Sequence, residues 1–249
     1  MTPIIDGAEP WSTEGGPTGV LVLHGLTSTP QAVTPLGRAL ASAGHAVEVP
    51  LLPGHGTSVD DLATSTWDDW ASAAVASYDG LAARCDRVAV AGLSLGGALA
   101  VWLAVERPAV AALAVVNPAV EAPVAEVRDS VAVMLGNGTT AIPTIANDVA
   151  DPDAKELAYD TLPVAALLSL FEAQAALAPR LAGITCPVLI FTSRQDHLVP
   201  TTASDLLAAS VAGEVERVWL ERSYHVATLD YDRDLIAKTA VDFLARVLH

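Results

Sequence analysis

The sequence has few positive charges and few aromatic residues. Thirteen Lys and Arg residues stand against 29 Asp and Glu residues, which gives a formal net charge of -16. Such an excess of negative charge repels phosphate backbones and anionic lipid headgroups, so we expect no nucleic acid partner and disfavour polyanionic substrates. Aromatic residues make up 5% of the chain and hydrophobic residues 52%. A folded core built mainly from Ala, Val and Leu follows.

Cysteine is also scarce. Cys85 and Cys186 form no Cys-x-x-Cys pair, and each lies just ahead of an apolar run. We therefore expect two free thiols rather than a disulfide. The sequence contains no cluster with metal-ligand spacing and no Gly-rich phosphate loop, so it implies no metal and no cofactor.

Long apolar runs are missing. The run Ala109–Val116 is ended by Asn117 and Pro118, well short of the roughly 18 apolar residues that a spanning helix needs. Residues 1–13 have no basic start followed by an apolar stretch. We expect no integral membrane segment and a cytoplasmic location.

Short β-branched runs alternate with segments of helical periodicity. The predicted strands are Val20–Leu23, Ala46–Val49, Arg87–Ala91, Leu113–Val116, Pro187–Thr192 and Val215–Leu220. The predicted helices are Gln31–Ala43, Trp67–Ala83, Gly97–Arg107, Thr201–Ala212 and Asp232–Leu248. Strands that alternate with helices predict an α/β fold, with a mostly parallel central sheet and helices on both of its faces.

One stretch interrupts this alternation. Residues 120–178 offer helical patterns and loops but no convincing strand, and they include an apolar helix that carries Leu167 and Phe171. We expect a small helical cap, inserted after the sixth strand and lying over the carboxyl edge of the sheet. Residues 1–119 and 179–249 then form the core.

The pentapeptide centred on Ser94 points to nucleophilic chemistry. Gly92-Leu93-Ser94-Leu95-Gly96 follows a predicted strand and opens a predicted helix, which is the setting of a nucleophile elbow. Glycines two residues on either side of the serine let strand and helix approach closely, and the tight turn holds the hydroxyl in the open. Ser94 is the expected nucleophile, and the amide of Leu95 at the helix start is an expected oxyanion donor.

A serine hydroxyl needs a histidine to accept its proton. His225 follows the last predicted strand and precedes the final helix, where the chain order Ser, Asp, His places the base. Asp196 lies just past a strong strand and is the expected acid, which would orient the imidazole. Glu121, after the preceding strand, is the alternative acid.

The loop after Val20–Leu23 is expected to supply the second oxyanion donor. The sequence His24-Gly25-Leu26 nominates the amide of Leu26, with His24 shaping the loop. We expect His55 to fix its own loop by a hydrogen bond, and a binding role is the alternative.

Five stretches together resemble the small bacterial carboxylesterases and monoacylglycerol lipases of the α/β-hydrolase superfamily. They are Leu21-Val22-Leu23-His24-Gly25-Leu26-Thr27, Pro53-Gly54-His55-Gly56, Gly92-Leu93-Ser94-Leu95-Gly96-Gly97, Asp196-His197-Leu198-Val199-Pro200 and Ser223-Tyr224-His225-Val226-Ala227-Thr228-Leu229-Asp230. The resemblance implies the α/β-hydrolase fold, the same two oxyanion amides and a cap that forms an acyl pocket.

The expected substrate-binding residues are Gly25, Leu167, Phe171, Tyr224 and Val226. Tyr224 departs from the resemblance, since the residue before the base is often glycine in this group. A larger side chain at this position would narrow the alcohol side of the pocket.

These residues predict a serine hydrolase that cleaves a neutral carboxylic ester through an acyl-Ser94 intermediate. The apolar cap and the acidic chain favour a fatty acyl ester such as a monoacylglycerol. The same triad would also serve a thioesterase, an acyltransferase or a perhydrolase, because a fold does not fix the acyl acceptor. Outside the enzymes, a ligand-binding protein that keeps the pocket without turnover is the alternative.

Overall fold

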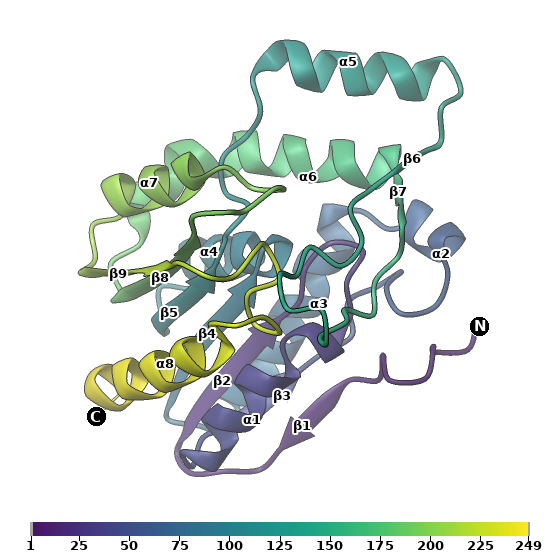
Figure 1. Cartoon of the computed structure of the whole chain (residues 1–249). Helices are drawn as coiled ribbons and strands as arrows, with labels where there is room; N and C mark the ends of the chain where they lie inside the picture. Colours follow the sequence, from purple (N-terminus) through teal and green to yellow (C-terminus); the bar gives the residue numbers. More distant parts are fainter. Residues whose placement is uncertain (1, 249) are drawn as a thin grey trace.

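A seven-stranded sheet forms the centre of the computed structural model, which describes residues 2–248 (Figure 1). Its strand order is β1-β3-β2-β4-β5-β8-β9, and all neighbours are parallel except β1 and β3. The strands are β1 (Trp11–Thr13), β2 (Thr18–Leu23), β3 (Ala46–Val49), β4 (Arg87–Leu93), β5 (Val110–Val116), β8 (Val188–Ser193) and β9 (Val215–Leu220). All six predicted strands are confirmed. The sequence does not predict β1, because three residues are too few to display a periodicity.

Helices cover both faces of this sheet, as predicted. One face packs against α1 (Thr34–Ser42) and α8 (Arg233–Val247), and the other against α3 (Trp67–Ala82), α4 (Leu95–Glu106) and α7 (Thr201–Ser210). Neighbouring residues of β4 join opposite cores: Val90 packs on the α4 side and Ala91 on the α1 side. This alternation, with both faces buried, explains why the parallel strands are continuous apolar runs. A short helix, α2 (Val59–Ala63), and a 3-10 turn, η1 (Pro30–Ala32), complete the core.

The segment between β5 and β8 rises over the carboxyl ends of the strands (Figure 1). It contains α5 (Ala125–Gly136), β6 (Ala141–Pro143), β7 (Thr161–Pro163) and α6 (Val164–Leu177), and leads into the 3-10 helix η2 (Ala178–Gly183). In Figure 1, α6 lies between α5 and the sheet. It contacts α2, α3 and α4 as well as α5.

Two expectations for this segment need correction. It contains an antiparallel strand pair, β6 and β7, which the sequence does not reveal because each strand is three residues long and includes a proline. The segment also follows the fifth strand of the described chain rather than a sixth. Among the described residues, β1 to β5 precede the insertion, and β1 is the antiparallel edge strand.

One helical stretch of residues 2–248, Val164–Gly183, is long and apolar enough to cross a membrane by length and composition alone. It joins α6 to η2. Within it, Gln174, Leu177 and Leu181 are buried against the rest of the protein. Core helices of folded proteins pass the same test.

Candidate active site

Ser94 occupies the tight turn between β4 and α4. Its backbone has φ 56° and ψ -116°, an unusual conformation for a residue with a side chain. Only glycine fits two residues before and two residues after Ser94. A Cβ on Gly92 would lie 2.2 Å from the Gly96 carbonyl oxygen, and a Cβ on Gly96 would lie 2.1 Å from the Leu23 carbonyl oxygen. The predicted elbow is therefore present, and the sequence needs both glycines to form it.

His225 and Asp196 lie together at the carboxyl edge of the sheet. His225 Nδ1 is 2.8 Å from Asp196 Oδ2, and their side chains are only 6% and 2% exposed. The ring nitrogen that faces a carboxylate carries the proton, so Nε2 is left to accept one from a serine. Glu121, the alternative acid, instead accepts a hydrogen bond from the Thr202 hydroxyl. Of these two carboxylates, the one in contact with the His225 ring is that of Asp196.

The charge state of His225 is set by opposing effects. Burial lowers its pKa, but the hydrogen bond and negative charge of Asp196, with the charges of Glu156 and Asp148, outweigh burial and raise the pKa above its ordinary value. The base is thus stabilised in its protonated form, which is the form that catalysis by a Ser-His pair creates in the transition state.

Two residues that the sequence does not single out hold the loop of the base. Asn117, with φ 45°, donates from Nδ2 to the His225 carbonyl oxygen (2.8 Å) and the Ser193 hydroxyl (2.9 Å). Asp148 accepts the His225 backbone N–H at Oδ2 (3.1 Å), and its Oδ1 lies 2.8 Å from Nδ1 of His197. Asn117 directly follows β5, which is a detectable signal. Asp148 lies in a loop without any motif.

The predicted oxyanion loop passes beside the nucleophile. A Cβ placed on Gly25 would lie 3.5 Å from the Cβ of Ser94, and Leu26 lines the same cavity as Ser94. Leu95 is the first residue of α4, where backbone N–H groups have no partner within the helix. Leu26 therefore lies in the wall of the cavity that contains Ser94, and Leu95 directly follows Ser94 at the start of α4.

His24 fixes this loop as a neutral side chain. Its Nε2 accepts the Leu52 backbone N–H at 3.1 Å, so Nδ1 is the nitrogen that donates to the Gly25 carbonyl oxygen at 2.9 Å. Burial holds the pKa of His24 well below its ordinary value. His55, in edge-to-face contact with His24, bonds through Nδ1 to the Pro53 carbonyl oxygen, and burial lowers its pKa to about 4. Its loop-fixing hydrogen bond is the one expected from the sequence.

Residues 147–160, which we call the strap, join the two sides of the site. On one side, Tyr159 N donates to the Thr27 carbonyl oxygen (3.0 Å) and the Thr29 hydroxyl donates to the Leu157 carbonyl oxygen (3.0 Å). On the other, Asp230 accepts the backbone N–H groups of Ala150 and Asp151 at 2.7 and 3.0 Å. The strap therefore ties the oxyanion loop to the loop of the base.

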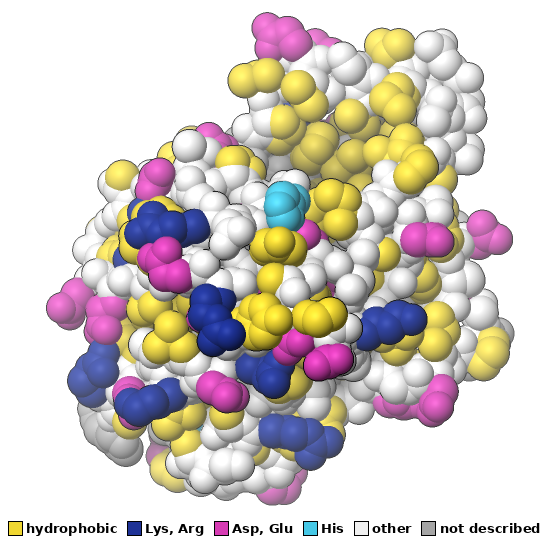
Figure 2. All heavy atoms as spheres, in the orientation of Figure 1, with side chains coloured by type: hydrophobic (Ala, Val, Ile, Leu, Met, Phe, Trp, Pro, Cys, Tyr) yellow, Lys and Arg dark blue, Asp and Glu magenta, His cyan; other side chains and the backbone are white. Residues whose placement is uncertain are grey.

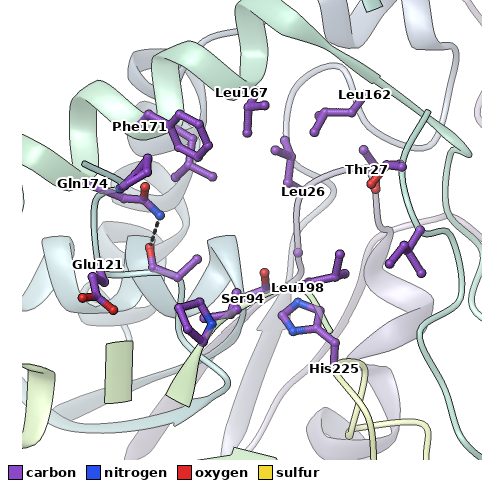
Figure 3. Close-up of a pocket in the computed structure, with 18 of the residues that line it drawn as sticks. Leu26, Thr27, Ser94, Glu121, Leu162, Leu167, Phe171, Gln174, Leu198 and His225 are labelled. Carbon is purple, nitrogen blue, oxygen red and sulfur yellow. Dashed lines mark hydrogen bonds between the residues drawn. The ribbon is translucent and has the colours of Figure 1, made fainter. Parts of the chain in front are cut away.

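A cavity of about 500 Å³ opens above Ser94 and His225 (Figure 3). Its wall includes four of the expected substrate-binding residues, Gly25, Leu167, Phe171 and Val226. Tyr224, the fifth, is a correction: it does not line the cavity, because its ring packs edge-on against His197, 4.6 Å away. The expected narrowing of the alcohol side by Tyr224 therefore has no basis in the geometry.

Glu156, which no sequence motif marks, lies in the strap and lines the cavity. Burial raises its pKa, against smaller opposing effects from Ser28 and His225. Figure 3 places Phe171, Gln174 and Glu121 on one side of Ser94, and Thr27 and His225 on the other. Glu156 lies near Ser28 and His225, since both act on its carboxyl group.

Hydrophobic side chains gather on the upper lobe of the molecule, around the hollow in that region (Figure 2). Val124, Val127, Val133 and Ile145 of this lobe are all exposed, and Val124 and Ile145 also line the cavity. Apolar surface therefore continues from the cavity wall to the outside. Among residues 2–248, no three His, Cys, Asp or Glu side chains gather closely enough to hold a metal ion.

The chain is similar to known proteins over most of its length. Residues 18–232 match the model of the Hydrolase_4 family, described as serine aminopeptidase, S33. The chain is 40% identical over 247 residues to a thermostable monoacylglycerol lipase of Bacillus sp. (strain H-257), covering 98% of this chain and 97% of that one. It is 26% identical over 241 residues to a carboxylesterase of Bacillus subtilis (strain 168), covering 96% and 97% of the two chains.

A solved structure from the work on LipS and LipT, two metagenome-derived lipolytic enzymes, superposes with a TM-score of 0.93 at 38% identity, covering 98% of this chain and 100% of that one. The family model spans most of the chain, and the first relative is matched over nearly its full length. The chain therefore belongs to the Hydrolase_4 family and is a serine hydrolase of the esterase and lipase type, with the α/β-hydrolase fold.

Proposed function

We propose that this chain hydrolyses monoacylglycerols and related neutral fatty acyl esters, with Ser94 as nucleophile, His225 as base and Asp196 as its orienting acid. The observation that carries the proposal is a single cavity whose wall includes both Ser94 and His225. The remainder of that wall is mainly apolar. The name of the 40% identical relative supports the monoacylglycerol as substrate.

The reaction follows from these positions. His225 Nε2 takes the proton of the Ser94 hydroxyl while Oγ attacks the ester carbon, and the amides of Leu26 and Leu95 donate to the resulting oxyanion. The tetrahedral intermediate then breaks its bond to the alcohol oxygen, which receives the proton from His225. Water next attacks the acyl-Ser94 carbon, giving its proton to His225, and the Ser94–acyl bond breaks as Oγ takes that proton back.

The lining of the cavity includes residues that suit each of the two parts of such a substrate. The leaving alcohol must lie beside His225, because that residue protonates it. Glu156 and Ser28 lie on this side, and their polar groups suit glycerol hydroxyls. Leu167, Leu170 and Phe171 of α6 form an apolar wall suited to the acyl chain. We also propose that residues 120–178 act as a cap over the core. The cytoplasmic location stays a prediction.

A substitution of the nucleophile tests this function. For purified Ser94→Ala protein we expect a kcat on monoacylglycerols and p-nitrophenyl esters that is lower than that of the wild type by at least about 10³-fold. Ser130→Ala, on the exposed face of α5, is the matched control and should keep full activity. Wild-type activity in the Ser94→Ala protein would refute the proposal.

A fluorophosphonate probe separates the alternatives. Labelling of Ser94 together with ester turnover supports the hydrolase. Labelling with faster transfer to coenzyme A, glycerol or peroxide than to water would replace hydrolysis with acyl transfer. Absence of labelling would favour a ligand-binding protein without turnover.

A further inference from the structure

We propose that Asp148 is a positioning residue for the base: through its carboxylate and its carbonyl oxygen it fixes the backbone of His225 and Val226. This inference rests on the proposed function, because it assigns a role toward His225. It also places part of the catalytic apparatus in the strap, in the segment above the sheet, rather than on the sheet itself.

The contacts of Asp148 carry the proposal. Its Oδ2 accepts the His225 backbone N–H at 3.1 Å, and its own carbonyl oxygen accepts the Val226 N–H at 3.0 Å. The backbone N–H groups of two consecutive residues, His225 and Val226, therefore both donate to one residue of the strap. Asp148 is only 5% exposed, and a carboxylate is buried at such a depth only where hydrogen-bond donors compensate its lost hydration.

The remaining carboxylate oxygen reaches the other side of the same loop system. Asp148 Oδ1 lies 2.8 Å from Nδ1 of His197, and the His197 backbone N–H lies 3.4 Å from Oδ2. His197 directly follows Asp196, the acid of the proposed triad. Asp148 therefore contacts the residue after the acid and the backbone of the base, so it fixes the separation between the two loops.

The local backbone aims Asp148 at this position. Asn147 adopts φ 67°, a left-handed conformation that asparagine tolerates better than most residues. The Asn147 side chain accepts the Glu156 backbone N–H at 2.6 Å, and its own N–H donates to the Glu156 carboxylate at 3.3 Å. The turn before Asp148 is thus closed by another residue of the strap, which leaves the aspartate little freedom.

A displacement of the base by about 1 Å costs on the order of 100-fold in rate. Positioning by Asp148 thus predicts a change in kcat and not in KM, because Asp148 does not line the cavity. The charged groups facing His225 are Asp196, Glu156 and Asp148, so removal of the Asp148 charge must also move the titration of the base.

The experiment compares Asp148→Asn, Asp148→Ala and Asp230→Asn in the full chain. Asp230 is fully buried and accepts backbone N–H groups of the same loop and the same strap, including that of Tyr224, but it is not among the charges that act on His225. It therefore controls for a purely structural effect. Each protein is measured for kcat and KM against pH, for thermal stability, and for the pH dependence of Ser94 labelling by a fluorophosphonate.

For both Asp148 variants we expect kcat to fall by about tenfold or more at an unchanged KM. On the acid side of the pH profiles of kcat/KM and of Ser94 labelling, the midpoint should shift to lower pH. Asp230→Asn should lose stability without that shift. The inference is overturned if the Asp148 variants keep the wild-type kcat and labelling rate, or if Asp230→Asn lowers kcat and shifts the pH midpoint equally.

The labelling arm separates this inference from the proposed function. A wild type that is labelled at Ser94 but cleaves no ester would refute the proposed substrate, and the shift in labelling would still decide the role of Asp148. If Asp148→Ala does not fold, the nearly isosteric Asn variant supplies the result.

Discussion

Asp196 divides its carboxylate between His225 and the loop that follows it. Oδ2 lies 2.8 Å from His225 Nδ1, whereas Oδ1 accepts the backbone N–H groups of Leu198 and Val199, each at 2.8 Å. The carboxylate that orients the imidazole is therefore held, through its other oxygen, by its own turn. This arrangement ties the tautomer of the base to the geometry of one short loop.

Replacement of Asp196 by Asn should impair catalysis far more than stability. The amide can still accept the Leu198 and Val199 N–H groups through its oxygen, but its NH2 group would face His225 Nδ1 and favour the wrong tautomer. We expect kcat for ester hydrolysis to fall by about 10³- to 10⁴-fold. Steady-state kinetics together with thermal unfolding check this, with Asp205→Asn, at an exposed site, as the control. A loss below about tenfold would remove Asp196 from the triad.

The pH dependence of activity should report the raised pKa of His225. The base works only when neutral, so kcat/KM falls as the pH drops through that pKa. Glu156→Gln removes one of the negative charges that raise the pKa, so the midpoint of the acid limb should move to lower pH.

Glu121→Gln is the matched comparison for that measurement. Glu121 also lines the cavity, but its charge is not among those that raise the pKa of His225. Its midpoint should equal that of the wild type. Equal shifts in both variants would show that the cavity as a whole, and not the proximity of Glu156 to the base, sets the profile.

Gly96→Ala should destabilise the fold as well as abolish activity. The new Cβ would lie 2.1 Å from the Leu23 carbonyl oxygen, so β2 and α4 must separate, at a cost of about 2 kcal/mol or more. Gly80→Ala is the contrasting substitution, because a Cβ on Gly80 of α3 meets nothing within 4 Å. Urea unfolding should show Gly80→Ala to be stabilised by about 0.5–1 kcal/mol.

His55 should make the protein less stable in weak acid. Burial lowers its folded pKa to about 4, whereas the unfolded chain titrates near the ordinary value of about 6.5. As the pH falls below that value, the unfolded state takes up a proton that the folded state refuses, so stability is lost between pH 6.5 and pH 4. The contribution is about 2 kcal/mol between pH 7 and pH 5.

His55→Gln tests this effect. The free energy of unfolding of the variant should depend less on pH between pH 7 and pH 5 than that of the wild type, although it is lower at pH 7 because of lost packing against Trp70. Parallel curves for the two proteins would contradict the assignment. His24, also buried and neutral, keeps part of the pH dependence in both proteins.

The sequence predicts what depends on local patterns. The elbow at Ser94 can be recognised because its two glycines stand at a fixed spacing from the serine. His225 and Asp196 can be recognised because each lies within a few residues of a strand end. Asp148 and Glu156 escape prediction because their roles depend on where an irregular loop passes over the sheet. The misplacement of Tyr224 has the same cause: its contact with His197 is a tertiary one that no periodicity records.

The strap sets a boundary for the exchange of caps between related enzymes. A chimera that replaces α5 and β6 alters exposed apolar surface but leaves the hydrogen bonds to Thr27, His225 and Asp230 in place. One that replaces residues 147–160 as well would remove the attachments of both catalytic loops at once. Selectivity for new esters is therefore best sought upstream of Asn147 and on the cavity face of α6, where sequence is free to diverge without dismantling the catalytic centre.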